Sequence, residues 1–265
     1  MKISLAIFGC LMSLVVSANA QKQVVPIVEL TIGGLAGGTE NGRWLNAKQT
    51  AAKLKKENEF VLIGWRGAEE GGVSLGKMSE PEIPCEEFYP VELELKKDSG
   101  VALGTSAKWN PVPRIPAPID ANNRTYKNAV ADVLKSKGIA KTIIKITEAY
   151  RIDLDADGRE EVVLAATYYK NGLSSSARIG DYSFILLRKI VNGKVQNILV
   201  GGDFITKNID FGAPNEVKLS TIADLNGDGK MELIIYGRYY EGHWVEIIEV
   251  KGNSPTKVLE TGCGV

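Results

Sequence analysis

Two nine-residue stretches of this 265-residue chain place oxygen-bearing side chains at alternate positions and end in a glutamate. The first reads Asp-Leu-Asp-Ala-Asp-Gly-Arg-Glu-Glu over residues 153–161, and the second reads Asp-Leu-Asn-Gly-Asp-Gly-Lys-Met-Glu over residues 224–232. Calcium takes about 6–8 oxygen ligands at roughly 2.3–2.6 Å, so a short loop must aim many oxygens at one point. We therefore interpret both stretches as calcium-binding loops, two Ca²⁺ sites in all, whose ions stabilise the fold.

The alternate positions of the oxygen-bearing side chains indicate which residues are the expected calcium ligands. In the first loop they are four side chains and one main-chain carbonyl: Asp153, Asp155, Asp157 and Glu161, with the carbonyl of Arg159. In the second loop they are Asp224, Asn226, Asp228 and Glu232, with the carbonyl of Lys230. Gly158 and Gly229 stand sixth in each loop, where the chain must turn sharply. The alternative is that both segments are plain hairpin turns that bind no ion.

An EF-hand is excluded, because it needs a bidentate glutamate at its twelfth position, where Leu164 and Ile235 stand. The residues after each loop are rich in β-branched and aromatic types, which favours strands. Asp-x-Asp/Asn-x-Asp-Gly-x-x-Glu leading into an apolar strand resembles the FG-GAP/VCBS-type repeats of integrin-like β-propellers and of many secreted bacterial proteins. The resemblance covers roughly residues 142–260 and implies calcium bound through the loop residues named above. A full propeller has at least four blades, whereas this chain holds two copies.

The C-terminal half shows two quartets of strand-like runs, each with an acidic loop between its first two strands. The runs are 142–152, 161–169, 182–191 and 195–201, then 216–223, 232–240, 243–250 and 256–260. They predict two propeller-blade-like four-stranded antiparallel sheets. We expect a mainly β protein of α+β type with a β-rich N-terminal region and one or two helices.

Further elements are expected outside the repeats. Strands are predicted at 24–32, 60–65 and 91–95, and the glycine run 33–38 is predicted to be a flexible or tightly turned loop. Asn46, with Gln49 three residues on, predicts a capped helix through about residue 56. A second helix is predicted over 123–137.

The chain is expected to consist of a signal peptide and three further regions. Residues 1–20 read as a signal peptide: Lys2 precedes an apolar run, and Ala18-Asn-Ala20 forms a cleavage site. The run is shorter than the ~18–20 residues needed for a membrane anchor, so we expect an exported, periplasmic or secreted protein without membrane insertion. A β-rich region (21–109), a Pro-rich linker (110–122) and a helix with two repeats (123–265) follow.

Charge and cysteine content restrict the partners. The chain has 32 basic and 32 acidic side chains. Such a balance argues against a nucleic-acid partner, which requires a basic surface, and against electrostatic membrane binding. Beyond the signal peptide only Cys85 and Cys263 remain. A disulfide between them suits an oxidising compartment, but the sequence leaves it open whether they come within reach.

No catalytic machinery stands out in the sequence. The sequence contains no Cys/His zinc cluster, and the single histidine, His243, lies on a predicted strand. The glutamates around Cys85 are best interpreted as a solvated acidic surface; they are Glu69, Glu70, Glu80, Glu82, Glu86 and Glu87. The favoured function is an exported calcium-binding module, binding or structural, with an envelope protein or a glycan as partner. The alternative is a hydrolase or enzyme accessory domain with an acidic cleft.

Overall fold

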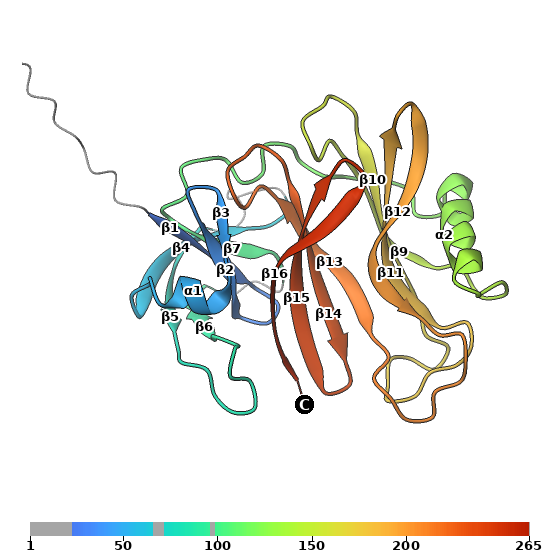
Figure 1. The fold of residues 1–265 in the computed structure, drawn as a ribbon, viewed down its shortest axis with the longest axis horizontal. Helices are drawn as coiled ribbons and strands as arrows, with labels where there is room; N and C mark the ends of the chain where they lie inside the picture. The colour runs from blue at the N-terminus through green and yellow to red at the C-terminus, as the bar shows by residue number, and fades with distance from the viewer. Residues whose placement is uncertain (1–22, 66–71, 96–98, 265) are drawn as a thin grey trace, which may run out of the picture.

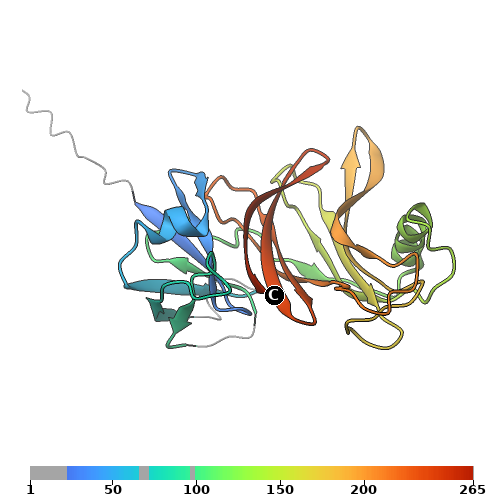
Figure 2. The same cartoon turned by 60° about the horizontal axis from the view of Figure 1, so that its bottom comes forward.

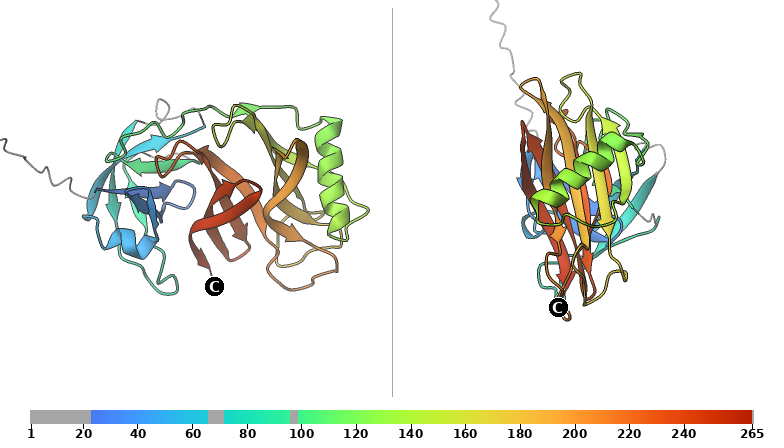
Figure 3. Two further views of the ribbon diagram at one scale, coloured as in Figure 1. Left: turned by 45° about the horizontal axis from the view of Figure 1, so that its top comes forward. Right: turned by 90° about the vertical axis from the view of Figure 1, so that its right-hand side faces the viewer.

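The protein is mainly β, as the sequence predicts. A computed structural model describes residues 23–65, 72–95 and 99–264; strands take 49% of the chain and helices 8%. Three antiparallel sheets lie side by side (Figures 1 and 3). The N-terminal sheet is at one end and a five-stranded sheet covered by a helix is at the other. The four-stranded sheet at the C-terminus stands between them, as Figure 2 also shows.

The N-terminal sheet has seven strands in the order β3-β2-β1-β7-β4-β5-β6. Their bounds are β1 (Val24–Glu29), β2 (Gly34–Glu40), β3 (Arg43–Leu45), β4 (Glu57–Ile63), β5 (Val73–Met78), β6 (Val91–Leu93) and β7 (Val101–Gly104). The helix α1 (Ala47–Ala51) carries the predicted capping box between Asn46 and Gln49. It ends about five residues earlier than predicted, because the following lysine-rich segment offers little apolar surface to bury.

The glycine run does not form the predicted loop. Residues Gly34–Glu40 form strand β2, which pairs with β1 on one side and β3 on the other. A Cβ atom on Gly38 would lie 2.6 Å from the carbonyl oxygen of Val25, and one on Gly37 would lie 2.4 Å from that of Leu45. Glycine therefore serves close approach of neighbouring backbones here.

The two C-terminal sheets are antiparallel meanders that contain all eight predicted strands. The five-stranded sheet consists of β8 (Ala117–Pro118), β9 (Ile146–Ile152), β10 (Glu161–Tyr168), β11 (Tyr182–Val191) and β12 (Lys194–Phe204). The four-stranded sheet consists of β13 (Glu216–Ala223), β14 (Glu232–Tyr239), β15 (Gly242–Lys251) and β16 (Ser254–Gly264). The prediction of four strands in the first sheet was wrong by one, because Ala117–Pro118 from the Pro-rich segment adds an edge strand to β9, a position that tolerates proline.

The helix α2 (Arg124–Ser136) closes the outer face of the five-stranded sheet. Asn123 caps it by accepting the N–H of Thr125 at 2.9 Å. Its apolar face, including Val130 and Leu134, packs on Leu164 and the neighbouring strands. The predicted helix is thus present within two residues at each end.

The N-terminal sheet and the two C-terminal sheets share one apolar core, to which Ile27, Val163 and Leu233 contribute. The N-terminal sheet is also attached to the four-stranded sheet by polar and covalent links. Ser220 Oγ donates to the buried Glu29 carboxylate at 2.6 Å. Cys85 and Cys263, 178 residues apart, form the disulfide that the sequence left open, with 5.2 Å between their Cα atoms. The Pro-rich segment therefore lies between the N-terminal and C-terminal regions in the sequence, but the sheets of these regions pack against each other.

Neither helix in the described part of the chain is long and apolar enough to cross a membrane.

Candidate metal centre

The acidic loops occupy equivalent places in the two C-terminal sheets. The first connects β9 to β10 and the second connects β13 to β14. In each case the closing glutamate begins the second strand: Glu161 pairs with Ile152, and Glu232 pairs with Ala223. Strand pairing therefore fixes the two ends of each loop next to each other.

The first loop is a set of tight turns held by its own carboxylates. Asp153 accepts the N–H groups of Asp157 at 3.2 Å and Gly158 at 3.1 Å. Glu161 Oε2 accepts the N–H of Leu154 at 2.9 Å. The fourth residue, Ala156, and the sixth, Gly158, have positive φ angles of 61° and 82°, so the turn at the sixth position favours glycine as predicted.

The second loop repeats these turns. Asp224 accepts the N–H groups of Gly227 at 2.7 Å and Gly229 at 2.9 Å. Glu232 Oε2 accepts the N–H of Leu225 at 2.8 Å. Gly227 and Gly229 have φ angles of 79° and 82°. The two copies thus share the bonds from the sixth residue to the first aspartate and from the second residue to the closing glutamate, while the other bond to the first aspartate comes from the fifth residue in the first loop and from the fourth in the second.

The structure brings part of the first predicted ligand set together. Asp153, Asp155 and Glu161 carry oxygens that all lie within 4.8 Å of one another, the one such group of His, Cys, Asp or Glu among the described residues. Asp155 Oδ1 is buried and has no hydrogen-bond partner there. Oxygen donors and an orphaned carboxylate oxygen fit a hard cation.

The remaining predicted ligands lie outside that group. Asp157 is exposed, and its Oδ1 accepts the N–H of Arg159. The side chains of Arg159 and Lys230 are also exposed, so only their main-chain carbonyls are expected to bind an ion. Asp228 is exposed and accepts the N–H of Lys230.

The second loop holds fewer carboxylates at the corresponding three positions. Asn226 stands where the first loop has Asp155, so the equivalent trio is Asp224, Asn226 and Glu232. All three are buried. Burial, reinforced by Asp224, Asp228 and Glu249, raises the pKa of Glu232 to about 9, so this carboxyl holds a proton at neutral pH unless a cation is bound.

Sequence reasoning missed Lys189 on β11, which points into the first loop. Its Nζ lies 2.7 Å from Asp155 Oδ2 and 3.0 Å from Glu161 Oε1, and its side chain is 6% exposed. Burial lowers the pKa of Lys189, but the hydrogen bonds to Asp155 and Glu161 outweigh it and bring the pKa above the ordinary value. Strand parity is the signal that could have found it, because Ile185 and Leu187 on the same face of β11 lie in the core.

Arg114, in the Pro-rich segment, connects the two loops and was also missed. Its guanidinium donates to the carbonyl oxygens of Asp153, Leu154 (3.2 Å) and Gly229 (2.8 Å). The N–H of Met231 donates directly to the carbonyl of Leu154 at 2.8 Å. The two loops therefore meet at the junction of the two C-terminal sheets.

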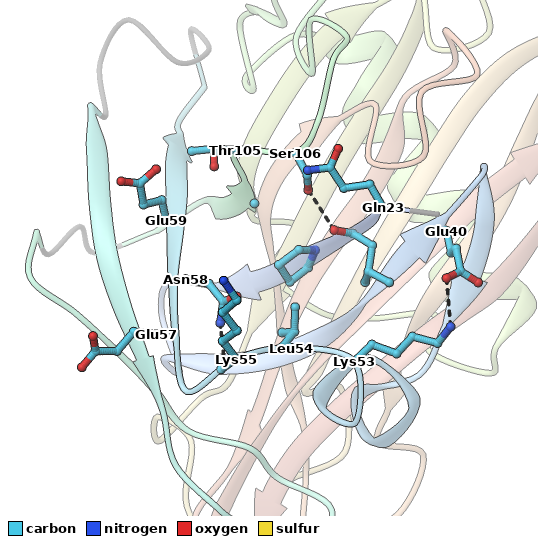
Figure 4. Close-up of a pocket in the computed structure, with 13 residues that line it drawn as sticks. Gln23, Glu40, Lys53, Leu54, Lys55, Glu57, Asn58, Glu59, Thr105 and Ser106 are labelled. Carbon is cyan, nitrogen blue, oxygen red and sulfur yellow. Dashed lines mark hydrogen bonds and ion pairs between the residues drawn. The ribbon is translucent and has the colours of Figure 1, made fainter. Parts of the chain in front are cut away.

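A cavity on the N-terminal sheet lies away from both loops (Figure 4). It has a volume of about 780 Å³, and none of its thirteen lining residues belongs to either loop. Two of its polar side chains already have partners: Lys53 contacts Glu40 at 2.9 Å, and Ser106 Oγ donates to the carbonyl of Val24 at 2.8 Å. These groups do not converge on the space between them.

A cavity of about 500 Å³ lies beside the disulfide. Glu87, Glu260 and His243 contribute to its walls. The Nε2 atom of His243 is buried without a hydrogen-bond partner among the described residues, and burial lowers the pKa of this imidazole. Of the predicted acidic surface, the described glutamates are exposed, namely Glu80, Glu82, Glu86 and Glu87. Glu69 and Glu70 lie outside the described residues.

Comparison with known protein families, with curated proteins and with solved structures finds no match for this chain.

Proposed function

We propose that this chain is an exported protein that binds calcium at its acidic loops and acts as a binding or structural module. The observation that carries the proposal is the repetition of one loop conformation. In both copies an aspartate at position one and a glutamate at position nine accept N–H groups from the same relative positions. Two plain hairpin turns have no physical reason to share a buried closing glutamate and a first aspartate arranged in this way.

The place of the loops supports a structural task for the ion. The loops meet through Arg114 and through the hydrogen bond between Met231 and Leu154. A divalent cation bound there would offset the repulsion among the carboxylates and hold the junction of the two sheets. Calcium would then stabilise the packing of the two sheets against each other.

Two features support export and an extracellular or envelope partner. The disulfide between Cys85 and Cys263 suits an oxidising compartment, in agreement with the expected signal peptide. Phe211 and Tyr240 are exposed aromatic residues whose rings lie 6.2 Å apart, and such rings suit stacking with a glycan or contact with an envelope protein.

The test is a calcium titration of residues 21–265 after chelation, by calorimetry with thermal unfolding in parallel. Binding heat and a raised melting temperature are expected, and magnesium should give a smaller shift because it demands stricter geometry. Glu232→Gln removes a buried loop carboxylate and should reduce both effects, while Glu57→Gln, an exposed change on β4, should leave them unaltered. If about millimolar calcium produces no binding heat and no change in melting temperature, the loops are plain turns that bind no calcium.

The enzymatic alternative is favoured by one observation. The cavity beside the disulfide brings acidic residues, Glu87 and Glu260, to the same walls as a buried imidazole nitrogen of His243. Carboxylates and imidazole are the usual acid–base groups of hydrolases. Hydrolysis of an ester or glycoside panel that disappears in Glu87→Gln and His243→Gln would support this alternative, and activity that survives both changes would refute it.

A further inference from the structure

The two loops differ in the residue that faces their closing glutamate across the next strand. Val162 pairs with Arg188, so the preceding residue, Glu161, faces Lys189. Leu233 pairs with Ile248, so Glu232 faces Glu249 in the same way. One position of the repeat thus carries a lysine in the first copy and a glutamate in the second.

Lys189 supplies a positive charge inside the first loop. Its ammonium contacts two of the three clustered carboxylates, at 2.7 and 3.0 Å, from a side chain that is almost fully buried. A divalent ion entering this site would have to separate the ammonium from Asp155 and Glu161 and leave it buried beside a second positive charge. Both changes oppose calcium binding, because a buried charge is costly once its partner is lost.

The single orphaned oxygen of the first loop does not change this balance. Oδ1 of Asp155 has no hydrogen-bond partner, but Oδ2 of the same carboxylate already contacts Lys189. The negative charge of Asp155 is therefore balanced without an added ion.

The second loop lacks such an internal cation. Among the described residues, no ammonium or guanidinium group lies within 4.0 Å of Asp224, Asp228 or Glu232. Glu249 is buried and receives N–H donors from Asn226 at 3.4 Å and Trp44 at 2.8 Å. Its lysine partner, Lys251, is 70% exposed and lies on the solvent side.

The buried cation separates the two loops. The first has four loop carboxylates and one buried lysine in contact with two of them. The second has three loop carboxylates and no buried lysine or arginine in contact with them among the described residues, since Lys251, the partner of Glu249, is exposed. A divalent ion entering the second loop therefore displaces no buried cation.

We infer that Lys189 is the resident cation of the first loop, so that calcium enters the second loop alone, where Glu249 stands at the position of the lysine. This inference rests on the proposed calcium binding and reduces the expected two ions to one. The first loop is then stabilised with or without calcium, whereas the second loop gains stability when calcium is bound.

The test exchanges the two facing residues and counts bound ions by calorimetry in residues 21–265. The unaltered chain should bind one Ca²⁺, Lys189→Glu should bind two, and Glu249→Lys should bind none. Far-UV circular dichroism in saturating calcium checks that each variant is folded. Lys189→Gln, a milder change, should also add a second ion and should lower the melting temperature in chelator, because Asp155 and Glu161 lose their partner.

The outcomes separate this inference from the proposed function. Two ions in the unaltered chain, or one ion in both Lys189 variants, would overturn the inference while leaving calcium binding intact. No ion in the unaltered chain would refute calcium binding. In that case a Lys189→Gln variant as stable in chelator as the unaltered chain would also refute the role of Lys189, whereas a lowered melting temperature would uphold it.

Discussion

Glu148 on β9 should make the protein less stable as pH rises towards neutrality. Its Oε2 atom is buried without a hydrogen-bond partner among the described residues. Burial raises the pKa of this carboxyl to about 7, against the lowering effects of Lys218 and of a hydrogen bond from the backbone at Leu219. An acid whose pKa is higher in the folded state takes up a proton on folding, so its stabilising contribution is fully present below about pH 4.5 and is lost as pH rises through about 7.

The magnitude follows from the shift. The pKa of Glu148 rises from the ordinary value of 4.5 to about 7, a difference of roughly 2.5 pH units. Each unit corresponds to about 1.36 kcal/mol, so the contribution to the free energy of unfolding is at most about 3.4 kcal/mol. The side chain keeps some contact with water, so we expect about 1–2 kcal/mol. Glu148→Gln keeps the shape and never ionises. It should be more stable than the unaltered chain by that amount at pH 8 and equal to it near pH 4.

The assay is urea unfolding of both proteins at pH 4, 6 and 8 at constant calcium. The difference in unfolding free energy should grow with pH for Glu148→Gln and stay flat for Glu57→Gln, which changes an exposed residue of β4. A difference that does not vary with pH, or a Glu148→Gln variant that is less stable at pH 8, would refute the reasoning.

Three other changes should alter stability by predictable amounts. Replacing Cys85 and Cys263 by serine opens a link across 178 residues, which should cost about 2–5 kcal/mol of unfolding free energy; a urea midpoint equal to that of the oxidised chain would contradict this. Arg114→Met leaves three loop carbonyls without their donor and should cost about 2–4 kcal/mol in thermal unfolding. A loss no larger than that of the exposed Lys108→Met would show that the guanidinium does not join the loops. Leu164→Ala opens a cavity under α2, where Leu164 is fully buried, and should cost about 2–5 kcal/mol by urea unfolding; a cost below ~1 kcal/mol would mean that the helix collapses into the space.

The strands of the C-terminal half could be predicted closely because their information is local. The predicted runs 182–191 and 216–223 match β11 and β13 residue for residue, since runs rich in apolar, aromatic and β-branched residues favour strands. The capping box of Asn46 is equally local. By contrast, the glycines of β2 are set by close approach of the backbones of the two neighbouring strands, β1 and β3, and β8 forms only because β9, beyond the helix α2, offers a free edge. The first depends on the distance between backbones and the second on a remote strand, and neither can be seen in the residue types.

The same limit explains why the acidic loops could be located but their charge balance could not. The repeat pattern ends at its ninth residue, whereas the side chain that decides the charge lies on the following strand: Lys189 is 28 positions after Glu161, and Glu249 is 17 after Glu232. Only the register of the β10–β11 and β14–β15 hairpins brings each residue opposite its glutamate. A calcium-loop pattern followed by a hairpin should therefore be interpreted together with the residue that faces its closing acid. A buried lysine there stands in for the ion, whereas an acidic residue leaves the loop without an internal cation.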